Sequence, residues 1–125
     1  MAGEIGGFAV RSKVWIEDGQ GRAVFGGGRC RILETVGRLN SLQAAAKELK
    51  MSYRAVWGRI RASEERLGQR LVESDGRGSR LTPFAQELVA AYRGIEATIR
   101  AETDAAFTAR WTKALDSESG PADKP

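Results

Sequence analysis

The 125-residue sequence contains no histidine and only one cysteine, Cys30. These absences exclude disulfide bonds within the chain, zinc sites built from Cys and His, and catalytic dyads or triads that need an imidazole. The acidic residues form no evident pair of the kind that general acid–base catalysis uses. The sequence therefore predicts a protein that is not an enzyme and that has no metal site and no cofactor.

Long apolar runs are also absent, since no stretch approaches the roughly 18 apolar residues that a transmembrane helix needs. The first ten residues, MAGEIGGFAV, lack the basic segment followed by an apolar run that marks a secretory signal. We therefore expect a cytoplasmic protein that has no membrane partner. A chain of this length predicts one compact domain with appendages.

Basic residues are concentrated in one part of the chain, although the net charge is only +4. Residues 29–80 contain 12 Lys or Arg against 6 Asp or Glu, which leaves +6 in this segment and −2 in the remainder. A local excess of positive charge is typical of a nucleic-acid-binding surface, because neutralising phosphates supplies much of the affinity. The alternative is that arginine serves here only as a solubilising residue.

The most informative stretch is residues 41–61, SLQAAAKELKMSYRAVWGRIR, which predicts two short helices joined by a tight turn. Leu42, Ala45 and Leu49 recur at helical spacing behind the capping residue Ser41. The small alanines of the first helix permit the close, steep crossing of a helix-turn-helix. The alternative is an ordinary helical hairpin whose polar face is merely solvated.

The second of these helices, residues 52–67, has an outer face suited to the major groove of DNA. An apolar line through Val56, Ile60 and Leu67 leaves polar and aromatic residues on the other side and in the first turn. Arginine forks onto guanine, and Tyr or Trp packs against thymine methyl groups or the backbone. The residues predicted to contact bases are Ser52, Tyr53, Arg54 and Trp57.

The segment that follows predicts a two-stranded ribbon. Residues 71–72 and 79–81 are strand-like and flank the turn 75–78, Asp-Gly-Arg-Gly. Three helices and a ribbon make a winged helix, with the wing at residues 74–80. Arg77 at its tip and Arg80 at its base suit contact with the DNA backbone or the minor groove. The alternative is an exposed hairpin that happens to carry two arginines.

The N-terminal residues 1–28 predict a β-hairpin followed by a flexible glycine linker. Strand-forming residues between 8 and 25 flank the turn Asp-Gly-Gln-Gly at 18–21. Gly26-Gly27-Gly28 precedes no phosphate-binding motif, and we therefore expect a connector there. A first core helix then spans residues 29–39, within a winged domain of residues 29–82.

A long helix is predicted over residues 83–115, because Thr82 caps it, Pro83 begins it and no further proline interrupts it. At 1.5 Å per residue it extends roughly 45 Å by Lys113, longer than a small domain needs. We therefore expect its exposed part to pair with a second copy in a homodimer, or to anchor a different partner. The residues predicted for dimerisation are Leu88, Tyr92, Ile95, Ile99, Phe107 and Trp111. Residues 116–125 are predicted to be a disordered tail.

Taken together, SLQAAAKEL, MSYRAVWGRIRASEERLG and RLVESDGRGSRLT resemble the N-terminal DNA-binding domain of LysR-type regulators. The MSYR-then-AW pattern at residues 51–57 resembles more closely the DNA-binding domain of the ModE family of molybdate-responsive regulators. The KVWIE…GRAVFGGGR stretch and the long helix also fit that family. The resemblance covers about residues 10–110, and its motifs are jointly specific although each is weak alone.

The resemblance implies that Tyr53, Arg54 and Trp57 lie where the family reads base edges. It also implies a set of backbone contacts: Ser41, Gln43, Arg61, Arg77 and Arg80. The sequence departs from the pattern at Ser63, where a large apolar residue is usual, so that the third helix either packs less well or gains a local hydrogen bond. The wing is shorter than that of ModE proteins. We also expect no oxyanion-sensing domain, since the chain ends where ModE proteins would continue.

These patterns predict a mainly α-helical protein with small β-sheets, a winged helix-turn-helix that binds double-stranded DNA as a dimer and regulates transcription. A separate effector-sensing protein is a further expected partner. The alternative function is a protein-interaction adaptor that uses the same fold and its long C-terminal helix.

Overall fold

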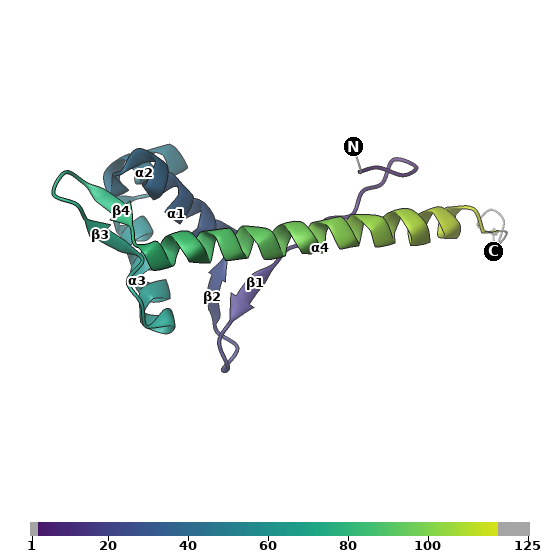
Figure 1. The fold of residues 1–125 in the computed structure, drawn as a ribbon. Helices are drawn as coiled ribbons and strands as arrows, with labels where there is room; N and C mark the ends of the chain where they lie inside the picture. Colours follow the sequence, from purple (N-terminus) through teal and green to yellow (C-terminus); the bar gives the residue numbers. More distant parts are fainter. Residues whose placement is uncertain (1–2, 118–125) are drawn as a thin grey trace, which may run out of the picture. The chain divides into compact units, whose positions relative to one another are not determined.

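The computed structural model describes residues 3–117, which fold mainly into helices with two small sheets (Figure 1). The described residues divide into two compact units: residues 13–94 form one, and residues 3–12 together with 95–117 form the other. The order of elements confirms the predicted winged helix-turn-helix followed by a long helix. The elements are β1 (Trp15–Glu17), β2 (Ala23–Gly26), α1 (Gly27–Leu39), α2 (Leu42–Leu49), α3 (Tyr53–Leu67), β3 (Val72–Ser74), β4 (Ser79–Leu81) and α4 (Pro83–Leu115).

Caps set the ends of the short helices α2 and α3. The Ser41 hydroxyl accepts a hydrogen bond from the Ala44 N–H at the start of α2, and the helix ends at Lys50 in the left-handed conformation. Helix α3 ends in the same way at Gly68, whose N–H donates to the Glu64 carbonyl. The serine cap predicted for α2 is therefore confirmed.

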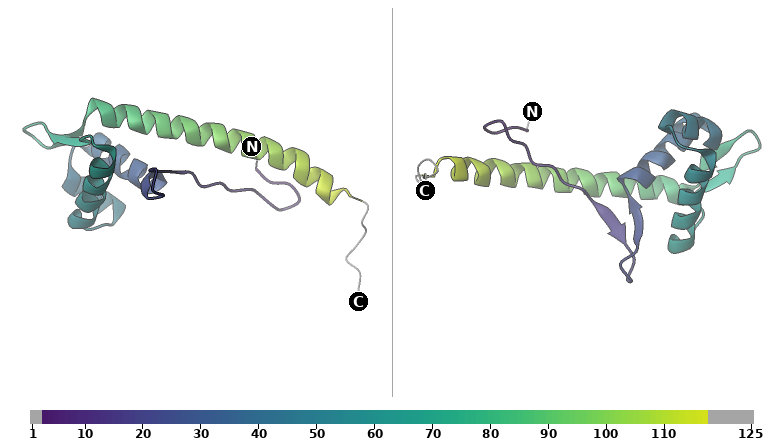
Figure 2. Two further views of the ribbon diagram at one scale, coloured as in Figure 1. Left: turned by 90° about the horizontal axis from the view of Figure 1, so that it is seen from below. Right: turned by 180° about the vertical axis from the view of Figure 1, so that it is seen from behind.

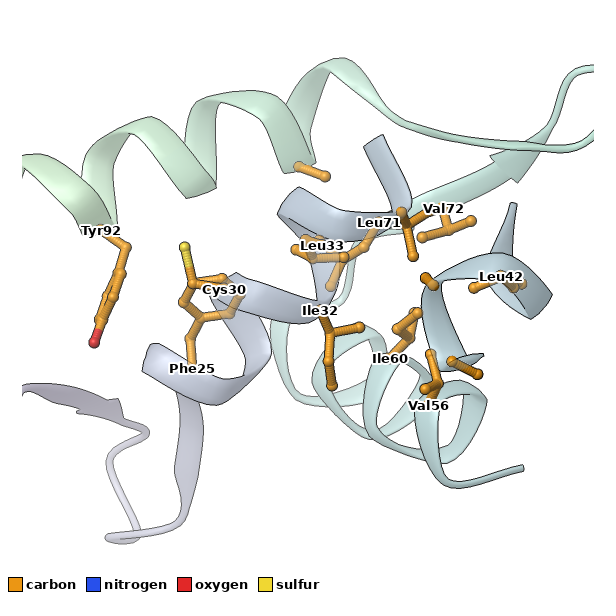
Figure 3. Close-up of a cluster of buried hydrophobic side chains, with 14 of the residues drawn as sticks. Phe25, Cys30, Ile32, Leu33, Leu42, Val56, Ile60, Leu71, Val72 and Tyr92 are labelled. Carbon is orange, nitrogen blue, oxygen red and sulfur yellow. The ribbon is translucent and has the colours of Figure 1, made fainter. Parts of the chain in front are cut away.

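The helix-turn-helix packs around small side chains, as its sequence predicted. Ala45 and Ala46 of α2 are 0% and 3% exposed, and Val56 of α3 is fully buried. Figure 3 shows Ile32 of α1 facing Ile60 of α3 in one cluster. Because alanine occupies little space, α2 lies close to its neighbours, which holds α3 in place.

Helix α3 lies between two separate antiparallel hairpins (Figure 2). On one side β3 pairs with β4, with Val72 opposite Leu81 and Ser74 opposite Ser79, and these strands form the predicted wing. Leu81 packs against α1 where Gly37 leaves room, since a Cβ added at Gly37 would lie 3.1 Å from the Leu81 Cδ1. The wing is therefore seated directly on the first helix.

On the other side of α3, the β1–β2 hairpin is shorter than predicted. Its strands cover only residues 15–17 and 23–26, around the expected turn, in which Asp18 accepts hydrogen bonds from the Gln20 and Arg22 N–H groups. The prediction of a glycine linker was wrong, because Gly26 ends β2 and Gly27 and Gly28 open α1. Three consecutive glycines in a sequence indicate a flexible segment. In the structure α1 begins directly after β2, so that no residue lies between them.

Ser63 joins this hairpin to α3. Its hydroxyl donates to the Val24 carbonyl at 2.9 Å and accepts from the Arg29 Nη1 at 2.7 Å, and the side chain is only 1% exposed. Of the two outcomes expected for a serine at this position, the structure shows a hydrogen bond. This bond links separate elements and is not local to α3.

Helix α4 begins as predicted, with the Thr82 hydroxyl accepting from the Ala85 N–H at 3.1 Å. Its early turns complete the core of the first unit, where Tyr92, Phe25 and Cys30 lie together (Figure 3). None of the helices within residues 3–117 combines the length and the apolar composition needed to span a bilayer.

The second unit contains the later part of α4 and the residues before 13. The Phe8 ring meets the Trp111 ring edge to face at 5.7 Å, and Phe107 stacks on Trp111 at 5.8 Å. Helix α4 ends at Leu115, and the Asp116 N–H still bonds to the Thr112 carbonyl. The predicted disordered tail lies outside the described residues from 118 onward.

Candidate nucleic-acid interface

The outer face of α3 is exposed, as the helical period predicted. The outward residues Arg54, Gly58, Arg61 and Glu65 are all exposed. On the inner face, Val56 and Ile60 are buried at 0% and 2% exposure. Tyr53 in the first turn is 50% exposed. The first turn and outer face of α3 are therefore free to contact a ligand.

Serine hydroxyls lie at the starts of both helices of the pair. Ser52 accepts from the Ala55 N–H at 3.0 Å, and Ser41 accepts from the Ala44 N–H at the same distance. Each hydroxyl acts as an acceptor in its cap, so its own proton remains able to donate to an oxygen such as that of a phosphate. Gln43, one residue into α2, is exposed.

Trp57 and Arg61 lie together on one flank of α3. The Arg61 guanidinium is 5.5 Å from the centroid of the Trp57 ring, and its Nε is 3.6 Å from the Glu64 Oε1. A cation–π contact of this kind contributes about 0.5–1 kcal/mol at an exposed site. It holds the arginine along the helix, and the half-buried Trp57 presents only part of its ring to solvent.

The wing turn is organised by the Asp75 carboxylate. Its Oδ1 accepts from the N–H groups of Arg77 at 2.9 Å and Gly78 at 2.8 Å, and its Oδ2 accepts from the Asn40 Nδ2 at 3.2 Å. The Arg77 N–H, followed by the Asn40 amide and the Gly78 N–H, keeps the pKa of Asp75 below its ordinary value. The turn is therefore fixed by the charged form of this side chain.

Asn40 also fastens the wing to the corner between α1 and α2. The Ser79 N–H donates to the Asn40 carbonyl at 3.1 Å. A Cβ at Gly78 would lie only 2.2 Å from that carbonyl oxygen, so glycine alone fits there. Close backbone contact therefore helps to determine the position of the wing relative to the helix-turn-helix.

The two wing arginines differ in their surroundings. Arg77 is exposed and, within residues 3–117, takes part in no ion pair. Arg80 is exposed as well, but its Nε lies 3.1 Å from the Glu73 Oε2. Arg77 is therefore the freer of the two cations, whereas Arg80 must share its charge with Glu73.

Glu64 supports the interface although the sequence interpretation passed over it. Its side chain is 6% exposed, and its Oε2 accepts from the N–H groups of Leu71 at 2.8 Å and Val72 at 3.4 Å. The Arg70 Nε lies 3.6 Å from the same oxygen. A signal was available, since residue 64 lies four positions after the inward Ile60 and so falls on the buried face of the helix. Glu64 links α3 to the first strand of the wing.

The predicted dimerisation residues fall into different surroundings. Ile95 and Ile99 are 44% and 37% exposed, whereas Leu88 is half-buried against the core of its own unit. Tyr92 was wrongly assigned to a dimer, because it is 1% exposed, packs against Phe25 and donates from its hydroxyl to the Val14 carbonyl at 2.7 Å. Phe107 and Trp111 are half-buried in the aromatic contacts of the second unit.

A three-helix core with a paired second and third helix and a two-stranded wing defines the winged helix-turn-helix class. Residues 28–86 match the family model of bacterial regulatory helix-turn-helix proteins of the lysR family. This segment therefore resembles the helix-turn-helix domain of the lysR family. No curated protein matches the sequence.

Solved structures agree with this assignment. The chain is similar to the DNA-binding domain of CbnR in a DNA complex, with 27% identity and a TM-score of 0.55 over 66% of this chain and 97% of that one. Full-length CbnR, a LysR family regulator, has 27% identity and a TM-score of 0.54. ArgP from Mycobacterium tuberculosis has 29% identity and a TM-score of 0.50. Each match covers 66% of this chain. The match spans only 29% of CbnR and 30% of ArgP.

Proposed function

We propose that the protein is a sequence-specific transcriptional regulator that binds double-stranded DNA as a homodimer. The observation that carries this proposal is the pairing of a capped helix with an exposed polar outer face and a wing locked beside the same helix-turn-helix. Helix α3 enters the major groove and the wing follows the backbone or the minor groove. The similarity to CbnR, whose DNA-binding domain was solved with DNA, supports the proposal.

The proposed contacts divide into two classes. Ser52, Tyr53, Arg54 and Trp57 contact base edges, where Arg54 is placed to recognise guanine. Backbone contacts come from Ser41, Gln43, Arg61, Arg77 and Arg80. The exposure of Arg54 and Arg77 supports these roles, because both guanidinium groups are accessible to a duplex.

We assign the exposed part of α4, with Ile95 and Ile99, to contact with a second copy of the chain. An amphipathic helix of this length exposes apolar side chains that a partner would cover. Two-fold pairing would set two α3 helices in successive major grooves about 34 Å apart, so that an operator with two-fold character is expected. The finer resemblance to the ModE family, and with it any response to molybdate, stays a prediction from the MSYR-then-AW pattern.

The test is selection of bound fragments from genomic DNA, followed by affinity measurements at 50 and 200 mM salt. A regulator of this kind enriches a motif with two half-sites and loses affinity by orders of magnitude over that range, because it neutralises several phosphates. Replacing the exposed Arg110, outside the proposed contacts, with Ala serves as the matched control and should leave both results unchanged. Binding that gives no motif and barely responds to salt would favour the adaptor function instead.

A further inference from the structure

The unit formed by residues 13–94 contains a cavity that the proposed DNA contacts do not use. Its volume is about 520 Å³, and it lies between the β1–β2 hairpin, the start of α1 and the turn before α3. This volume falls within the range of about 300–1,000 Å³ that small-molecule sites occupy. Its apolar lining includes Val14, Trp15, Phe25, Ile32, Leu49 and Met51.

The polar lining of the cavity is entirely cationic. Lys13, Arg29, Arg31 and Arg59 line it, and no acidic residue does. Within residues 3–117, none of these four side chains forms an ion pair. Loss of water lowers the pKa of Arg29, and the positive charges of Arg66 and Arg59 lower it further. This mutual repulsion is the situation that a bound anion relieves.

Two further features favour an anion in the same place. Helix α1 starts at the cavity without a side-chain cap and without an acidic residue in its first turn, so its N-terminal N–H groups add partial positive charge. Gly28 lines the cavity, and a Cβ added there would meet no atom within 4 Å. Trp15 also lines the cavity, and its aromatic ring, 51% exposed, lies at the edge of the cavity.

We propose that this cavity binds a small organic anion, one with a flat apolar body and a carboxylate or similar group. The apolar floor receives the body, and Lys13, Arg31 and Arg59 hold the charged group. Arg29 adds its charge behind them, because its Nη1 already donates to the Ser63 hydroxyl. A phosphate of the DNA backbone would satisfy the cations but leave the apolar floor unoccupied. The hairpin that forms one wall precedes residues 28–86, so the cavity lies partly outside the family match. This site does not depend on the proposed DNA binding.

The probe is 8-anilinonaphthalene-1-sulfonate, which combines fused rings with one anionic group, titrated into the full-length protein without DNA. We expect one molecule bound per chain, with a shift of the Trp15 indole N–H signal in NMR spectra and none at Trp111. The analogue N-phenyl-1-naphthylamine lacks the anionic group, and inorganic sulfate lacks the aromatic rings. Each should bind at least about tenfold more weakly than the probe.

Variants locate the site. Lys13→Gln and Arg59→Gln should each weaken probe binding about tenfold, because each removes one charge-assisted contact. Gly28→Glu should abolish binding by placing a carboxylate in the cavity, whereas Gly28→Ala should retain it. Arg110→Gln, which removes a cation far along α4, is the matched control and should have no effect.

Circular dichroism and urea midpoints check that each variant is folded. If Gly28→Glu does not fold, Lys13→Gln and Arg59→Gln still test the site. Equal binding of the charged and uncharged rings would overturn the proposal, since the cavity would then be an apolar surface only. Displacement of the probe by sulfate at equal concentration would also overturn it, as would unchanged affinity in both cation variants.

Discussion

The two hairpins on either side of α3 are alike in type but are held in different ways. Each has two antiparallel strands of three or four residues, too short to be stable alone. The β1–β2 hairpin is anchored mainly by apolar burial, with Phe25 at 2% exposure, and by the hydrogen bond from Ser63 to the Val24 carbonyl. The wing is anchored by hydrogen bonds as well as by apolar contacts, through Glu64 at its first strand and Asn40 at its turn, beside the buried Val72.

The difference follows from what each hairpin exposes. A wing held by its backbone amides and by Asp75 leaves the Arg77 side chain free to contact DNA, while Arg80 pairs with Glu73. A hairpin held by a buried aromatic ring supports the start of α1 and forms a cavity wall. In each hairpin, therefore, the atoms that hold the hairpin in place differ from the atoms that are available to contact a ligand.

Removing the apolar anchor should have the largest effect on stability. Phe25→Ala is expected to lower the free energy of unfolding by about 3–5 kcal/mol, because the ring is buried against Tyr92 and a cavity would replace it. Urea unfolding monitored by circular dichroism measures this. The control is Trp15→Ala on the same hairpin, which is half exposed and should lose clearly less. Equal losses would show that burial of Phe25 is not the anchor.

Removing the polar anchor of the wing should have an intermediate effect. Glu64→Ala leaves the N–H groups of Leu71 and Val72 without their acceptor, at about 1–3 kcal/mol for a buried donor left unsatisfied. The neighbouring variant Glu65→Ala, on the exposed face, should change stability by no more than about 0.5 kcal/mol. If both variants unfold at the same urea concentration, Glu64 does not hold the wing.

The smallest effect concerns the charge of Asp75. Its pKa is lowered on folding, so this carboxylate adds stability above the ordinary pKa of 3.8, and that stability is lost as the pH falls through the lower folded value. The stability difference between the natural protein and Asp75→Asn should therefore be constant near neutral pH and shrink below about pH 4. Carbon NMR titration of the Asp75 carboxyl group should give a midpoint below 3.8, returning to that value in unfolding urea. A folded midpoint at or above 3.8 would contradict the account of the turn.

Local sequence patterns predicted the elements that depend on local interactions. The cap at Ser41, the inner face of α3 and the wing turn at Asp75 all follow from spacing and hydrogen-bonding chemistry within a few residues. The span 83–115 of α4 was predicted for the same reason, because its start has a capping threonine and a proline and its interior has no helix breaker.

Features that depend on contacts distant in the sequence were missed. The residues predicted for dimerisation are apolar or aromatic, but their spacing along α4 does not say whether Tyr92 meets a second chain or Phe25 of its own hairpin. The glycines at 26–28 were misread because the chain turns from strand into helix with no connector. The cavity, which forms only where the hairpin meets α1, has no local signal at all.

The central claim, that α3 reads bases while the wing holds the backbone, is tested most directly by comparing Arg54→Ala with Arg77→Ala on the selected operator and on random duplex. Arg54→Ala should cost about 1–3 kcal/mol on the operator, with little change on random DNA. Arg77→Ala should weaken both alike and reduce the salt slope by about 1. If Arg54→Ala loses the same affinity on operator and random DNA, Arg54 does not read bases and the claim is wrong.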